Sequence, residues 1–193
     1  MPITSASLSI AANQFKYQVN LMLILETKII SNFSMETTNL HNTLLALLLA
    51  LKDSETPLSD REQSDLYQVA EQLSANPKAW EILIEPRLLV MIQANEPLNQ
   101  RFKAVKYQLD NLGDTMPLNL LPSKAELEQA VPKQKPQPTT RAIPQVSPSD
   151  LRSNEITNMA IKVLAAPNPS ETAKKLSSFE QLQQFLNQNF AQK

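Results

Sequence analysis

Leu44 to Leu51 form an unbroken run of eight apolar residues, and no other part of the chain limits the fold as strongly. Together with Leu40, leucines in this region recur at offsets of 0, 4, 7, 8 and 11 residues, the 3.6-residue period of an α-helix. A helix that is apolar around most of its circumference must be surrounded, either by helices of the same chain or by a second subunit. The run is far shorter than the ~20 apolar residues of a membrane-spanning helix, so no span is predicted.

Capping signals mark the starts of several more helices. Ser59 and Glu62 have the spacing of a capping box, and Ser123 and Glu126 repeat it. Asn76-Pro77 offers a capping residue followed by a proline suited to a first helical turn. Apolar stripes with helical spacing follow these starts and predict helices: Leu66, Val69, Ala70 and Leu73; Trp80, Leu83 and Ile84; and, after Glu96-Pro97, Leu98, Phe102, Val105, Leu109 and Leu112.

Pro86 interrupts this pattern. It lacks an amide proton and its ring crowds the preceding turn, which predicts a kink or break near Glu85. The apolar run from Leu88 to Ile92 is then predicted to be a buried segment. The expected fold is all-α: an irregular bundle of about five to six helices over residues 36–130.

A proline-rich segment follows this predicted core. Residues 131–149 hold five prolines and few large apolar side chains, which is typical of a flexible linker. Residues 150–193 then carry two helical stripes, which predict a C-terminal helix pair. For the final helix, packing onto the bundle or against the helix before it is favoured over docking in the groove of a partner, and whether the pair docks on the core stays open. The two stripes are Ile156, Met159, Ala160, Val163 and Leu164, and Phe179, Leu182, Leu186 and Phe190.

The first 34 residues have no clean period. Two interpretations stay open: a poorly patterned N-terminal element, or an untranslated upstream extension with Met35 as the true start. No credible signal peptide is found, so a cytoplasmic location is the default expectation.

The composition excludes most enzyme classes. There is one glycine in 193 residues, so the Gly-rich loops that cradle phosphates and the Gly-x-Ser-x-Gly nucleophile elbow are absent. Without cysteine there are no disulfides, thiolate nucleophiles or cysteine–zinc sites. The only histidine, His41, is expected to be an exposed or capping residue at a helix start. No catalytic residue, cofactor or metal site is therefore predicted.

Charge separates the middle of the chain from its end. Residues 36–130 carry 14 acidic and 8 basic side chains, whereas residues 131–193 carry 4 acidic and 8 basic ones. Arg101, Lys103 and Lys106 form the nearest approach to a basic cluster, but helical spacing does not place all three on one face. The basic tail and this cluster nevertheless make nucleic-acid binding the alternative function. An enzyme using isolated carboxylates ranks third.

The leading expectation is a non-enzymatic protein that acts by protein–protein interaction, as a scaffold or regulator. Its partner would be another protein or a second copy of the chain. Helix-in-groove recognition is one mode that such apolar stripes serve. The residues expected to bind the partner are Leu44, Leu48, Leu51, Phe179, Leu182, Leu186 and Phe190.

Overall fold

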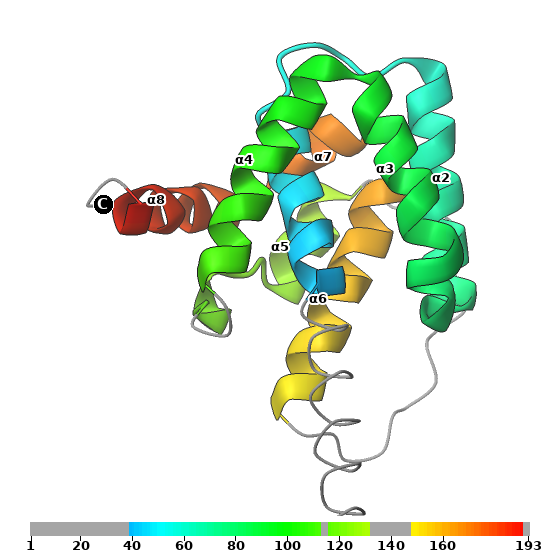
Figure 1. Ribbon diagram of the computed structural model, residues 1–193. Helices are drawn as coiled ribbons and strands as arrows, with labels where there is room; N and C mark the ends of the chain where they lie inside the picture. The colour runs from blue at the N-terminus through cyan, green and yellow to red at the C-terminus, as the bar shows by residue number, and fades with distance from the viewer. Residues whose placement is uncertain (1–38, 113–115, 132–147, 191–193) are drawn as a thin grey trace, which may run out of the picture. The chain divides into compact units, whose positions relative to one another are not determined.

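The computed structural model describes residues 39–112, 116–131 and 148–190 (Figure 1). These residues form helices and no strand, which confirms the predicted all-α class. A helix over residues 39–52, called the central helix below, comes first. It is followed by α2 (Asp60–Ala75), η1 (Pro77–Ala79), η2 (Trp80–Ile84), α3 (Glu85–Ala94), α4 (Glu96–Leu112), η4 (Leu118–Leu120), α5 (Lys124–Ala130), α6 (Pro148–Leu164), α7 (Pro169–Lys174) and α8 (Ser178–Phe190).

The central helix lies in the middle of the unit formed by Asn39–Lys193. Residues 41–51 are all buried, and Leu44 to Leu51 have no exposed surface. Figure 1 shows this helix, in blue, between α4 and α3. Its leucines belong to one apolar core with side chains from α2, α3, α4, α6 and α8. The surplus apolar surface predicted for this helix is therefore covered by helices of the same chain.

Polar contacts hold the described part of the central helix at two places. In its first described turn, Asn42 Nδ2 donates to Asp110 Oδ1 on α4 over 3.0 Å. At its end, Lys52 Nζ donates to Gln183 Oε1 on α8 over 2.9 Å. Buried polar side chains need such partners because losing their hydration without compensation is costly. These bonds fix how the central helix sits against α4 and α8.

The first predicted capping box is present. Ser59 Oγ accepts from the amide of Glu62, and the Glu62 carboxylate accepts from the amide of Ser59 over 2.7 Å. The pair satisfies two amides that have no partner inside the first turn. Asn76, by contrast, does not cap with its side chain, and Pro77–Ala79 form only a 3-10 turn.

Pro86 changes the winding of its helix instead of breaking it. The preceding residues, Trp80–Ile84, form a π-helix in which the amide of Glu85 bonds to the carbonyl of Trp80. Proline has no amide proton, and its ring would crowd the carbonyl four residues earlier in an α-helix. The wider i→i+5 turn accommodates the proline, and α3 continues directly from it. Of the kink or break predicted near Glu85, the break is absent, and the chain passes through a π-helical turn instead.

The wider winding also corrects the predicted stripe of Trp80, Leu83 and Ile84. Trp80 and Ile84 are buried, but Leu83 is 56% exposed. A π-turn rotates each residue less far around the axis than an α-turn. Leu83 therefore lies away from the buried side on which an α-helical period would have placed it.

The C-terminal helices share the core of the preceding bundle, which answers the question that the sequence left open. Ile156 of α6 is 1% exposed, and Phe179 of α8 is fully buried. The short α7 between them was not predicted, although Asn168 and Pro169 give the same start signal as Asn76-Pro77. The predicted extension 1–34 and nearly all of the predicted linker 131–149 lie outside the described residues.

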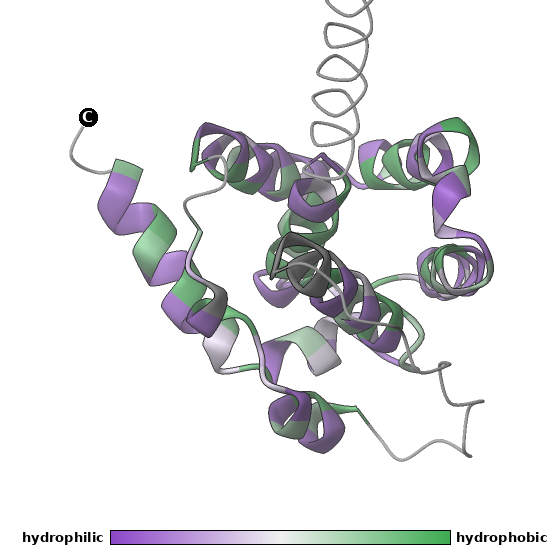
Figure 2. Cartoon of the chain, turned by 90° about the horizontal axis from the view of Figure 1, so that it is seen from below, coloured by the Kyte–Doolittle hydropathy of each residue, from purple (hydrophilic) through white to green (hydrophobic). Residues whose placement is uncertain are grey.

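Most helices are amphipathic, and Figure 2 shows green and purple bands alternating along them. This is expected of helices that bury one side and expose the other. Within the described ranges, no helix has both the length and the apolar composition that crossing a bilayer requires.

Candidate functional site

The residues predicted to bind a partner lie mainly inside the molecule. Six of them have at most 1% of their surface exposed, and Phe190 is partly buried. Their apolar surface contacts other parts of the same chain, so it forms no open docking face in this arrangement. The six buried residues are Leu44, Leu48, Leu51, Phe179, Leu182 and Leu186.

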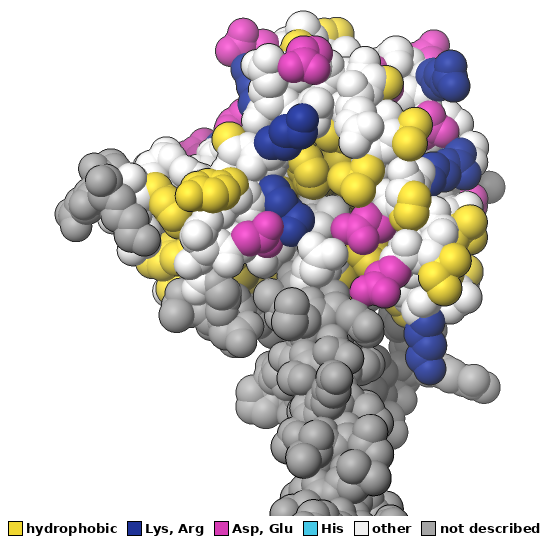
Figure 3. All heavy atoms as spheres, viewed as in Figure 1, with side chains coloured by type: hydrophobic (Ala, Val, Ile, Leu, Met, Phe, Trp, Pro, Cys, Tyr) yellow, Lys and Arg dark blue, Asp and Glu magenta, His cyan; other side chains and the backbone are white. Residues whose placement is uncertain are grey.

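A different apolar surface is open to solvent on η2 and α3. Ile82 is 88% exposed, Leu83 56% and Val90 68%, and Pro86 and Ala94 are exposed as well. These five residues are called the η2–α3 stripe. Four of them follow one another at intervals of four residues, which places them along one side of a helix. Figure 3 shows exposed apolar side chains in the right half of the view, where α2 and α3 lie, with charged side chains among them.

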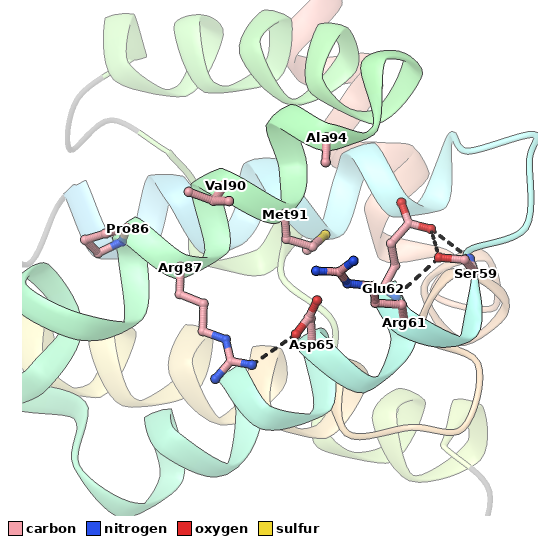
Figure 4. A pocket seen from close by; sticks show the side chains of 9 residues that line it. All are labelled: Ser59, Arg61, Glu62, Asp65, Pro86, Arg87, Val90, Met91 and Ala94. Carbon is pink, nitrogen blue, oxygen red and sulfur yellow. Dashed lines mark hydrogen bonds and ion pairs between the residues drawn. The ribbon is translucent and has the colours of Figure 1, made fainter.

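A pocket of about 760 Å³ lies beside this stripe, between the first half of α2 and α3. Figure 4 shows that its lining comes from two sources: charged and polar side chains mainly from α2, and apolar side chains from α3. Pro86, Val90 and Ala94 belong to both the stripe and the pocket lining. The full lining is Ser59, Arg61, Glu62, Asp65, Pro86, Arg87, Val90, Met91 and Ala94.

Two polar links join α2 to the segment 85–95 on either side of the pocket. Arg87 Nη2 contacts Asp65 Oδ1 over 3.0 Å, and Asn95 Nδ2 donates to Glu62 Oε1 over 2.7 Å. The links are eight residues apart along α3, which corresponds to about 12 Å at 1.5 Å per residue. The pocket therefore lies between the first turns of α2 and a segment that two side-chain contacts hold against it.

The charges that line the pocket are not equally engaged. Burial raises the pKa of Glu62, but hydrogen bonds from Ser59 and Asn95 outweigh this effect and hold its pKa below the ordinary value. Asp65 is paired with Arg87. Arg61 is exposed, and its side chain forms no ion pair or hydrogen bond with another described residue. Among the charged side chains that line the pocket, Arg61 is therefore the one still able to bind a group of another molecule.

The predicted basic cluster is largely engaged within the chain. Arg101 contacts Glu55 over 3.3 Å, and Lys106 contacts Asp110 over 2.8 Å. Lys103 is exposed. Two of the three cations are thus already close to carboxylates, which lowers the positive potential that the cluster offers to phosphate.

The other residues that could carry chemistry differ in their surroundings. The carboxylate of Glu85 accepts from Thr43 Oγ1 over 3.3 Å, and Glu81 is exposed. His41 is 8% exposed, so of its two expected roles, exposed or capping, the exposed one is wrong, and the capping one stays a prediction. Among the described residues, no three His, Cys, Asp or Glu side chains gather into a group that could hold a metal ion.

The stripe and pocket were not predicted from the sequence. The sequence contains the regular spacing of Ile82, Pro86, Val90 and Ala94, but its apolar run from Leu88 to Ile92 predicts a buried segment. In the structure Leu88, Met91 and Ile92 are buried while Val90 is exposed.

Comparisons with protein-family models, with characterised proteins and with solved structures find no match to this chain.

Proposed function

We propose that this protein acts by non-enzymatic protein–protein interaction, and that the η2–α3 stripe is its docking surface. The observation that carries the proposal is the high exposure of Ile82 and Val90 on one side of a continuous helix. Contiguous exposed apolar surface rimmed by polar groups is characteristic of protein interaction sites. The adjoining pocket between α2 and α3 gives this surface a concave part.

This proposal keeps the function expected from the sequence but moves the surface. The buried leucines of the central helix stabilise the fold. The partner binds the exposed residues of the η2–α3 stripe instead. The nucleic-acid alternative has less support, because Arg101 and Lys106 lie beside Glu55 and Asp110.

Capture experiments from native cells test the proposal. The tagged full-length chain is compared with Ile82→Asp and Val90→Asp variants, and co-purifying proteins are quantified by mass spectrometry. A partner held by the wild-type chain should be depleted about tenfold or more in both variants, because each places a charge in an apolar interface. Sedimentation of the purified wild-type chain over a range of concentrations shows whether that partner is a second copy.

Tyr107→Asp is the matched control. Tyr107 is 67% exposed on α4, outside the stripe, so the substitution adds the same charge to a similarly exposed apolar position. Circular dichroism should show all three variants folded. If the proteins retained by Val90→Asp and Tyr107→Asp are the same as those of the wild type, and sedimentation finds a monomer in every case, the η2–α3 stripe is not a docking surface.

A further inference from the structure

The walls of the pocket determine how a partner can bind there. Both walls are α-helices, in which backbone amides and carbonyls bond to one another within each helix. An extended segment cannot add to these walls as a β-strand, because no sheet edge is available to pair with. Recognition must therefore use side chains. A partner helix presents several side chains on one side without leaving its own backbone groups unpaired.

The dimensions of the site match a short stretch of helix. Pro86 and Ala94 mark the two ends of the apolar lining on α3, about 12 Å apart at 1.5 Å per residue. Two turns of a partner helix span nearly the same length. Its side chains at positions i, i+4 and i+7 would then lie along Val90 and Met91. The exposed Ile82 and Leu83 extend the same surface beyond the pocket.

Charge selects among such helices. Glu62 and Asp65 are engaged by Asn95 and Arg87, so their negative charges are already partly compensated. Arg61 has no described partner, and Figure 4 shows its side chain extending from α2 toward α3 among the lining residues. A guanidinium next to an apolar surface forms short, often bidentate hydrogen bonds with carboxylates.

We propose that the α2/α3 pocket binds an amphipathic helix that carries a glutamate or aspartate beside its apolar stripe, with this carboxylate paired to Arg61. The inference rests on the proposed function, and it specifies the chemistry of the partner. The whole chain has a net charge of −1, so general attraction does not favour an acidic ligand. A preference for acidic helices would therefore arise locally, at Arg61.

Two synthetic peptides test this partner chemistry against the full-length chain. Each has about 18 residues, long enough to hold a helix, and carries leucines at i, i+4, i+7 and i+11. One has glutamates beside the leucines and the other has lysines at the same positions. Fluorescence anisotropy measures the affinity, and ¹⁵N–¹H NMR shifts locate the bound peptide. The acidic peptide should bind about fivefold more tightly, the upper range for one partly exposed ion pair, and its addition should shift the amides of Arg61, Val90 and Met91.

Arg61→Glu should reverse the preference, and Lys103→Glu is its matched control. Lys103 is exposed on α4, so its substitution changes the net charge equally without touching the pocket. The preference in the wild type should also weaken in 0.5 M salt, because partly exposed ion pairs are screened.

Three results would overturn the inference. Equal binding of both peptides, abolished by Val90→Asp, would leave the docking surface in place but exclude selection by Arg61. Binding that Val90→Asp does not affect would put the peptide elsewhere. If neither peptide shifts the amides of the pocket, the acidic helix is not its ligand, and the capture experiment decides separately whether the stripe binds protein.

Discussion

Glu126 joins α5 to α8 across 52 residues of chain. Its Oε1 accepts from the amide of Ser178 over 3.0 Å and from Ser177 Oγ over 2.9 Å. Its Oε2 accepts from Ser178 Oγ. Carboxylates near a helix N-terminus are favoured by the unpaired amides and by the helix dipole. A residue from one helix therefore caps the start of another.

These hydrogen bonds hold the pKa of the Glu126 carboxyl group below its ordinary value. Burial raises the pKa of Glu126, but the hydrogen bonds from Ser178 and Ser177 more than offset this effect. Because folding lowers the pKa, the ionised carboxylate stabilises the folded chain at pH values above its ordinary pKa of 4.5. This stabilisation is lost as the pH falls through the lower pKa of the folded state.

Glu126→Gln should lower the free energy of unfolding by about 1–2 kcal/mol at pH 7, because charge-assisted hydrogen bonds become neutral ones. Urea denaturation measures the change. The difference from the wild type should begin to shrink below pH 4.5, where Glu126 of the unfolded chain takes up a proton. It should be lost once the pH is below the lower pKa of the folded state, where the folded carboxylate is neutral as well.

Glu128→Gln is the control for this prediction. Glu128 lies on the same helix, is exposed, and has Lys124 at 4.0 Å. Its loss should change stability by no more than about 0.5 kcal/mol. A Glu126→Gln penalty that is no larger, or that persists unchanged at pH 3, would contradict the cap.

At the scale of elements, the apolar periodicity and the capping signals of the sequence predict where helices form. They predict less well which other helix a side chain contacts. Ser59 and Glu62 form the box that their spacing indicates. Ser123 caps α5 as expected, yet the Glu126 carboxylate turns to α8. Local spacing indicates which amides a side chain can reach within its own turn, but it carries no information about a helix that arrives later in the chain.

The η2–α3 stripe was missed for a related reason. Ordinary α-helical spacing assigns Leu83 to the buried side, whereas the π-turn before Pro86 leaves it 56% exposed. The effect of proline on winding depends on whether the surrounding core keeps the chain helical through Ile84. The sequence around Pro86 does not contain that information.

Two neighbouring substitutions test this winding. Ile84→Ala should cost about 2–5 kcal/mol of stability, because Ile84 has no exposed surface and a cavity would remain. Leu83→Ala should cost at most about 0.5 kcal/mol while weakening partner binding. Thermal or urea unfolding of both variants measures the contrast. Similar costs at the two positions would mean that Leu83 is buried and that the helix winds as an ordinary α-helix.

At the scale of the whole molecule, a single core joins both ends of the described chain. Leu48 of the central helix and Val163 of α6 are both fully buried in it. The segment predicted as a tethered tail therefore supplies part of the interior.

A split chain tests that arrangement. A protease recognition sequence placed within residues 132–147 would allow the folded protein to be cut. The two fragments should stay together in gel filtration and should unfold in one transition, because separation would expose Ile156, Phe179 and Leu182 to water. The same insertion left uncut is the control. Fragments that separate without denaturant would show that the C-terminal helices are not part of the core.

The burial of Leu44 to Leu51 also has a consequence for synthesis. This run leaves the ribosome roughly 100 residues before Ile156 of α6. At a synthesis rate of about 5–20 residues per second, α6 follows these leucines out of the ribosome on the order of 5 to 20 seconds later. During that interval the nascent chain presents its most apolar segment without its final neighbours. Early termination of translation would release that segment uncovered, and such fragments are expected to aggregate or to be held by chaperones.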